Sequence, residues 1–132
     1  MTMSLSRQPG AEDIARAIWL GAARQTFVAR EREACCVCGK YRWLTQAHHL
    51  VPLTMQYDAG LAVPIQDYAW LCPTHHVAIH LLIANVVAAY ERRITPSALQ
   101  MLGESEPSEI AALFKLVDAF TALYYAAAPG AA

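Results

Sequence analysis

The pattern of hydrophobic and polar positions predicts a helix near the start of the chain. Over residues 11 to 32, the apolar residues Ile14, Ile18 and Val28 recur near the helical period. Residues that repeat in this way share one face of a helix. We therefore expect a helix over residues 11 to 32 that presents these three side chains on a single face.

The second half of the chain is predicted to be mostly helical. A helix over residues 74 to about 92 follows Pro73, a residue favoured in the first turn, and a short helix begins at Thr95-Pro96 and stops at Gly103. A last helix over residues 107 to 127 carries apolar residues at alternating spacings of three and four, namely Ile110, Leu113, Val117, Phe120 and Tyr124. Such a stripe is typical of a packing face, with a helix-pair or dimer seam as the alternative.

The stretch between these helices lacks a helical period. Residues 35 to 53 begin with a Cys-x-x-Cys-Gly turn, continue with "YRWLT", which has strand-like composition, and then with "AHHLV", which Pro52 ends. This order predicts a knuckle and a short hairpin. Residues 54 to 66 contain Gly60 and Pro64 and are expected to form a loop.

The chain length and the net charge limit the possible architecture and the possible binding partners. The 132 residues suffice for one domain with a modest core, and the formal charge of −1 gives no global basic field. Residues 1 to 42, however, hold seven Arg and Lys against four acids, whereas residues 43 to 132 hold three against seven. The candidates to contact a polyanion, unless they form a solvated helix face, are Arg30, Arg32, Lys40 and Arg42.

The chain shows no pattern of a secreted or membrane protein. Residues 1 to 10 lack the apolar core of a secretory signal, and the longest apolar run, "VAIHLLIANVVAA", is too short to span a bilayer. We expect a soluble, cytoplasmic protein with no membrane partner. In a reducing compartment, clustered cysteines indicate metal or redox chemistry more often than disulfides.

Two pairs of soft ligands predict a structural zinc site. Cys35 and Cys38 form Cys-x-x-Cys before a glycine, and Cys72 and His75 form Cys-x-x-His 34 residues later. Together they supply the four ligands of a closed tetrahedral zinc site. The rival interpretation, a thioredoxin-like redox pair, lacks the strand-helix context it requires. Cys36 is left over and is expected to pack in the core.

The remaining histidines suggest a second ion. His76 and His80 lie four residues apart on a predicted helix, so they project from one face and could grip one ion. His48 and His49 are neighbours on a predicted strand, where alternation sends adjacent side chains to opposite faces. Both could serve one site only near the end of the strand.

The ordered set "CVCG", "AHHLVPL" and "DYAWLCPTHHVAIH" resembles the HNH endonuclease family, the zinc-knuckle branch of the ββα-metal nucleases. The resemblance covers residues 35 to 80 and does not extend to the flanking helices. Together with the chain length and the helices predicted from periodicity, it implies an α+β, mostly helical fold in a single domain, residues 1 to 132. A zinc-stapled ββα-metal, treble-clef-like core over residues 35 to 92 would carry an N-terminal helix, residues 11 to 32, and a C-terminal helical extension, residues 95 to 128.

The resemblance also implies a role for each matching residue. The structural zinc ligands of the family correspond to Cys35, Cys38, Cys72 and His75. The ligands of a catalytic divalent ion, whether Mg²⁺, Mn²⁺, Ni²⁺ or Zn²⁺, correspond to His48, His76 and His80. The general base corresponds to His49. The asparagine position falls on Asp67, which could bind a divalent ion but lacks the amide N–H of asparagine.

The function that follows is metal-dependent hydrolysis of DNA phosphodiester bonds. The ion would bind the scissile phosphate while His49 takes a proton from the attacking water. DNA would be held through its phosphates, without regard to sequence, by the basic residues of the first third. The alternative is a catalytically inactive zinc module of the same kind that binds nucleic acid or a protein partner.

Overall fold

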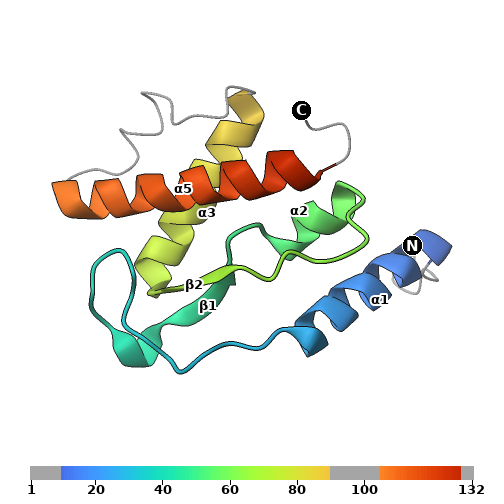
Figure 1. Ribbon diagram of the computed structural model, residues 1–132, viewed down its shortest axis with the longest axis horizontal. Coiled ribbons are helices and arrows are strands. Elements are labelled where there is room, and N and C mark those ends of the chain that lie inside the picture. The colour runs from blue at the N-terminus through green and yellow to red at the C-terminus, as the bar shows by residue number, and fades with distance from the viewer. Residues whose placement is uncertain (1–9, 90–104, 129–132) are drawn as a thin grey trace, which may run out of the picture.

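The computed structural model describes residues 10 to 89 and 105 to 128, which fold as an α+β, mostly helical unit with one two-stranded sheet (Figure 1). The elements in chain order are α1 (Ala11–Thr26), the short 3-10 helix η1 (Arg42–Leu44), β1 (Gln46–His49), α2 (Leu53–Asp58), β2 (Tyr68–Leu71), α3 (Pro73–Ala89) and α5 (Pro107–Ala127). In Figure 1, α5 lies across α3, and α1 runs beside α2 at the far side of the sheet.

The sheet pairs two segments that lie far apart in the sequence. Strands β1 and β2 are antiparallel, with His48 opposite Ala69 and His49 opposite Tyr68. The chain between them contains α2, so the connection is far longer than a hairpin turn. The prediction of a hairpin within residues 35 to 53 is therefore wrong.

The segment "YRWLT" forms η1 instead of a strand. Tyr41 has a left-handed backbone (φ 61°), which turns the chain before η1 begins. The buried hydroxyl of Thr45 then donates to the carbonyls of Glu33 and Arg42, holding the segment against the preceding chain. The apolar residues that suggested a strand remain on the surface, since Trp43 is 80% exposed.

Residues 54 to 66, predicted as a loop, are helical at their start. Helix α2 occupies Leu53–Asp58, and Gly60 then adopts a left-handed backbone (φ 82°) that leads into the remaining loop. The fully buried amide of Gln56 holds this loop. It donates to the carbonyls of Val51 and Ile65 and accepts the backbone N–H of Ile65.

Helix α1 is shorter than predicted and turns a different face inward. It ends at Thr26, because Phe27 is extended (φ −71°, ψ 129°) and packs its ring against His49 and Tyr68. The predicted stripe faces solvent, since Ile14 is 50% and Ile18 is 66% exposed. The residues of α1 that are buried against α2 are Leu20 and Ala23.

The start of helix α3 and both ends of helix α5 confirm their predictions. Helix α3 begins at Pro73 and is described to Ala89, so its predicted end near residue 92 and the short helix predicted over residues 95 to 103 lie outside the described residues. Helix α5 has the predicted bounds. Its stripe packs into the main core through the buried side chains of Leu113, Val117 and Phe120.

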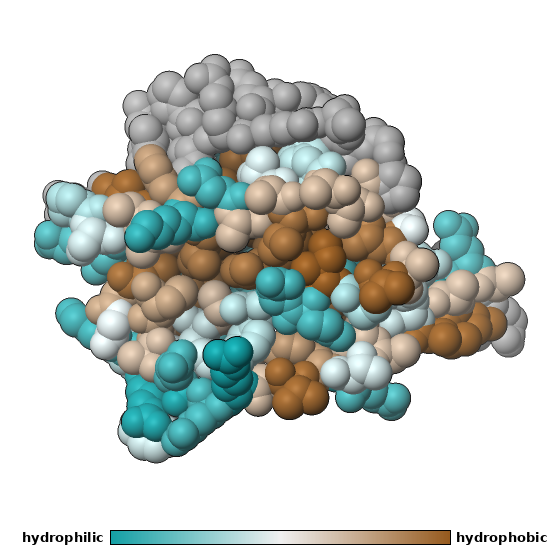
Figure 2. All heavy atoms as spheres, viewed as in Figure 1, coloured by the Kyte–Doolittle hydropathy of each residue, from teal (hydrophilic) through white to brown (hydrophobic). Residues whose placement is uncertain are grey.

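Length and composition alone would allow α5 to cross a membrane. A core helix of a soluble protein meets the same test. The core beneath α5 contains Leu71, Ile79, Leu82 and Val86 together with Cys35 and Cys72. Figure 2 shows hydrophobic side chains gathered across the middle of this face along α5, and hydrophilic ones at the lower left, over the segment that contains η1.

Candidate metal centres

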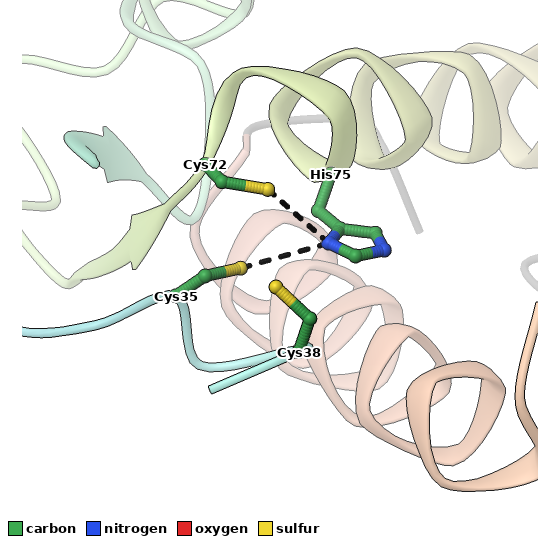
Figure 3. A group of neighbouring side chains, drawn as sticks. All are labelled: Cys35, Cys38, Cys72 and His75. Atoms are coloured by element: carbon green, nitrogen blue, oxygen red, sulfur yellow. Dashed lines mark hydrogen bonds between the residues drawn. The ribbon is translucent and has the colours of Figure 1, made fainter. Parts of the chain in front are cut away.

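The two predicted pairs of soft ligands meet in one cluster. Cys35 and Cys38 come from the turn before η1, Cys72 directly follows β2, and His75 lies in the first turn of α3 (Figure 3). The turn closes because Gly39 takes a left-handed backbone (φ 71°) and donates its N–H to the Cys35 carbonyl at 2.7 Å. The four donor atoms all lie within 4.8 Å of one another.

The spacing of these donor atoms fits a metal ion with tetrahedral coordination. The Nδ1 atom of His75 lies 3.3 Å from the sulfur of Cys72 and 3.7 Å from that of Cys35. Zinc with bonds of about 2.3 Å to sulfur and about 2.0 Å to nitrogen would separate these atoms by about 3.5 Å. Three sulfurs and one imidazole nitrogen, mostly buried, could therefore hold a structural metal ion such as zinc.

The thiols of Cys35 and Cys38 have very different pKa values. Burial raises the pKa of Cys35, but hydrogen bonds from the backbone, that of Cys72 first, outweigh burial and bring the pKa down to about 6. Burial, with a smaller contribution from the neighbouring Cys35, raises the pKa of Cys38 to about 11. Without an ion, the negative charge of one thiolate opposes ionisation of the next thiol. A bound cation would offset this repulsion.

A second cluster lies between β1 and α3. The Nε2 atom of His80 is 3.1 Å from Nε2 of His48 and 3.1 Å from Nε2 of His76. An ion bound to three imidazoles at about 2.0–2.1 Å would hold their nitrogens roughly 3.0–3.4 Å apart. Because each neutral ring carries a single proton, three converging nitrogens satisfy one another poorly by hydrogen bonding alone. They fit a shared cation better.

Burial favours the neutral, metal-binding form of His48 and His80. Burial, followed by repulsion from a charged His80 or His76, lowers the pKa of His48 to about 3. Burial and then His76 also lower the pKa of His80. His80 is nevertheless exposed at one edge, beside a shallow hollow of about 250 Å³ that it lines with His76, Val77 and Leu81. The cluster is therefore accessible from solvent.

His49 faces the other way from its neighbour. Its ring lies 4.5 Å from that of Phe27, and its Nε2 is 2.7 Å from Oε1 of Gln66. The amide of Gln66 also donates to the carbonyl of Ala23 at 3.0 Å and to the hydroxyl of Thr26 at 3.3 Å. Since a carbonyl can only accept, the amide nitrogen must face α1 and the amide oxygen must face His49.

Asp67, predicted at the asparagine position, belongs to neither cluster of the described residues. Its side chain is exposed, and its backbone carbonyl accepts the N–H of Leu50 at 2.8 Å, which extends the pairing of the two strands. No motif pointed to Gln66 as the partner of His49. Gln66 directly precedes Asp67, the residue at the predicted asparagine position.

The predicted DNA-contacting residues are all exposed but differ in their partners. Arg32 donates to the Thr45 carbonyl and stacks over Trp70, with 5.6 Å from its guanidinium carbon to the ring centroid. Arg42 pairs with Glu31 at 3.4 Å and stacks over the exposed ring of Trp43. Arg30 lines a groove of about 530 Å³ together with Asp67 and Trp70. Lys40 is exposed on the cysteine turn.

Cys36 does not pack in the core as expected. Its side chain is exposed, although its backbone N–H donates to the Trp70 carbonyl at 3.0 Å. Side chains alternate between the core and the surface in this turn. Cys35 and Val37, on either side of Cys36, are the buried residues, so Cys36 faces outward.

Comparison with known proteins identifies no relative. No protein-family model, curated protein or solved structure gives a significant match to this chain. The sites therefore have to be interpreted from their own geometry.

Proposed function

We propose that this protein is a metal-dependent endonuclease of the HNH type that hydrolyses DNA phosphodiester bonds. One observation supports this most strongly: the imidazoles of His48, His76 and His80 converge beside an exposed hollow, while the adjacent His49 stays outside the cluster. A structural zinc site alone would require none of these four histidines. The order of a strand pair followed by a helix, β1, β2 and α3, is also the one expected for a ββα-metal core.

The triad would hold one divalent ion at the scissile phosphate. His48 supplies a buried, neutral ligand from the strand, and His76 and His80 supply two more from adjacent turns of α3. When bound, such an ion neutralises charge that develops on the phosphate and on the leaving oxygen. The exposed side of His80 leaves room for the phosphate to approach.

His49 would take the proton from the attacking water. Because Gln66 offers its amide oxygen, Nε2 of His49 carries a proton, and Nδ1 is the nitrogen that remains free to accept one. An imidazole suits this role because its ordinary pKa lies near neutral pH. Gln66 would then be a positioning residue that holds the base in one tautomer and one orientation.

The Cys₃His cluster would do no chemistry. It joins the turn before η1 to the start of α3 and so keeps β1 in register with the helix that carries the other two histidines. DNA would be bound mainly through phosphates by the exposed Arg30 and Lys40, with Arg32 and Arg42 contributing where their internal partners allow.

Incubation of the purified protein with supercoiled plasmid tests the proposal. Nicking is expected with at least one of Mg²⁺, Mn²⁺, Ni²⁺ or Zn²⁺. His49→Ala should lower the nicking rate by at least about 10²-fold, within the range for removal of a general base, while keeping both ions. His80→Ala should instead lose the ion of the triad and keep the structural one, which elemental analysis would show.

A wild-type protein that carries both ions yet cleaves no DNA under any of these metals would sink the endonuclease proposal. It would favour the alternative, a non-catalytic zinc module. The exposed position of Asp67 away from the triad is the observation that favours this alternative.

A further inference from the structure

An acidic side chain of α5 reaches the back of the zinc-binding cluster. The carboxylate oxygen Oε1 of Glu109 lies 3.5 Å from Nε2 of His75, and the two side chains are only 23% and 11% exposed. In Figure 3, the other ring nitrogen of His75 points at the sulfurs of Cys72 and Cys35, whereas Nε2 points away from them. The faint orange ribbon of α5 passes beside the cluster in the same view.

The chemistry of the ring determines what Glu109 can do. If Nδ1 of His75 is used for a metal ion, the single proton of the neutral ring must sit on Nε2. A carboxylate next to that N–H accepts it, which fixes the tautomer and the ring orientation and makes the ligating nitrogen more basic. Glu109 is placed to accept from His75 in this way.

The packing of α5 explains why the carboxylate lies there. Leu113 follows Glu109 by four residues, so both side chains lie on the same face of the helix. Leu113 is fully buried in the core cluster that also contains Cys35 and Cys72. Docking the apolar stripe of α5 therefore brings Glu109 to the first turn of α3, where His75 is located.

We propose that Glu109 is the outer partner of the metal site: it positions His75 and couples the docking of α5 to the binding of the ion. The proposal does not depend on endonuclease activity. It gives the C-terminal helix, which the HNH resemblance does not cover, a direct part in holding the metal.

Zinc affinity, measured by competition with a chromophoric chelator, tests the proposal. Glu109→Ala is expected to weaken zinc binding 10- to 100-fold, the effect typical of losing an outer partner. Glu109→Gln keeps an oxygen that can accept the His75 N–H and should recover most of the loss. The matched control is Asp118→Ala, which removes an exposed acid nine residues further along the same helix and should bind zinc as the wild type does.

A second readout follows the hydrogen bond itself. In ¹⁵N-labelled zinc-loaded protein, the Nε2–H proton of His75 should be protected from exchange with solvent and should lose that protection in Glu109→Ala. Wild-type zinc affinity in Glu109→Ala, or equal losses in the Ala and Gln variants, would overturn the proposal. Should the Ala variant fold poorly, the Gln variant alone decides, since protection of the His75 proton must survive in it.

Discussion

Adjacent residues on β1 lie on opposite faces of the strand. His48 is buried against α3, and His49 lies on the other face against Phe27 and Gln66. Alternation along a strand predicts this separation. What the sequence could not supply was the partner of His49, because Gln66 lies 17 residues away and becomes a neighbour only through the strand pairing and the fold of the intervening loop.

The role of Gln66 leads to a prediction at the residue scale. Gln66→Leu removes the oxygen that holds Nε2 of His49, so the ring can rotate and change tautomer. Nicking should fall by about 10²-fold, the effect of a small misplacement of a reacting group, while both ions stay bound. Long-range ¹H–¹⁵N spectra should show the His49 proton on Nε2 in the wild type. In the variant they should show a mixture of the two neutral tautomers.

The control for this prediction is Gln46→Leu, a change of the same kind at an exposed position of β1. It should leave rate and tautomer unchanged. A Gln66→Leu protein that cleaves at the wild-type rate with an unaltered His49 spectrum would show that the amide does not position the base.

At the scale of elements, the sequence predicted what depends on neighbours along the chain and missed what depends on distant pairing. Helices α3 and α5 have regular local signals, such as a proline in the first turn and a repeated apolar stripe. Residues 41 to 45 have the composition of a strand, yet β1 pairs with β2, and no strand in the described part of the chain pairs with residues 41 to 45. Ile14 and Ile18 likewise repeat at helical spacing, but the face of α1 that meets α2 is the one carrying Leu20 and Ala23.

The loop that presents Gln66 depends on a single amide. Gln56 is fully buried and forms three hydrogen bonds with the backbone of Val51 and Ile65. Gln56→Leu would bury those backbone groups without partners, and each such group costs about 1–3 kcal/mol. We expect urea unfolding to show a loss of roughly 3 kcal/mol, together with weaker nicking because Gln66 is displaced.

Gln25→Leu is the matched control, since Gln25 is exposed on α1 and should change stability by less than about 0.5 kcal/mol. Equal urea midpoints for the Gln56 and Gln25 variants would mean that the loop holds itself without the buried amide.

For the whole molecule, the Cys₃His cluster joins two parts of the chain that lie far apart in the sequence. It links the turn after residue 34 to the start of α3, and its sulfurs belong to the same core as the stripe of α5. The free energy of binding a structural zinc ion, about 10–16 kcal/mol in small zinc-folded peptides, is as large as the entire stability of a typical domain, about 5–15 kcal/mol. Removal of the ion should therefore disrupt the fold and not merely loosen one turn.

Chelation provides the final prediction. A strong chelator, or Cys72→Ser, should abolish cooperative thermal unfolding as followed by near-ultraviolet circular dichroism, and zinc should restore it to the chelated wild type but not to the variant. Cys36→Ser is the control, because that thiol is exposed and outside the cluster, and the variant should melt as the wild type does. The histidine triad should also lose its ion in Cys72→Ser, since β1 and α3 are no longer held in register. A zinc-free Cys72→Ser protein with a wild-type melting temperature would show that hydrophobic packing alone holds these elements together.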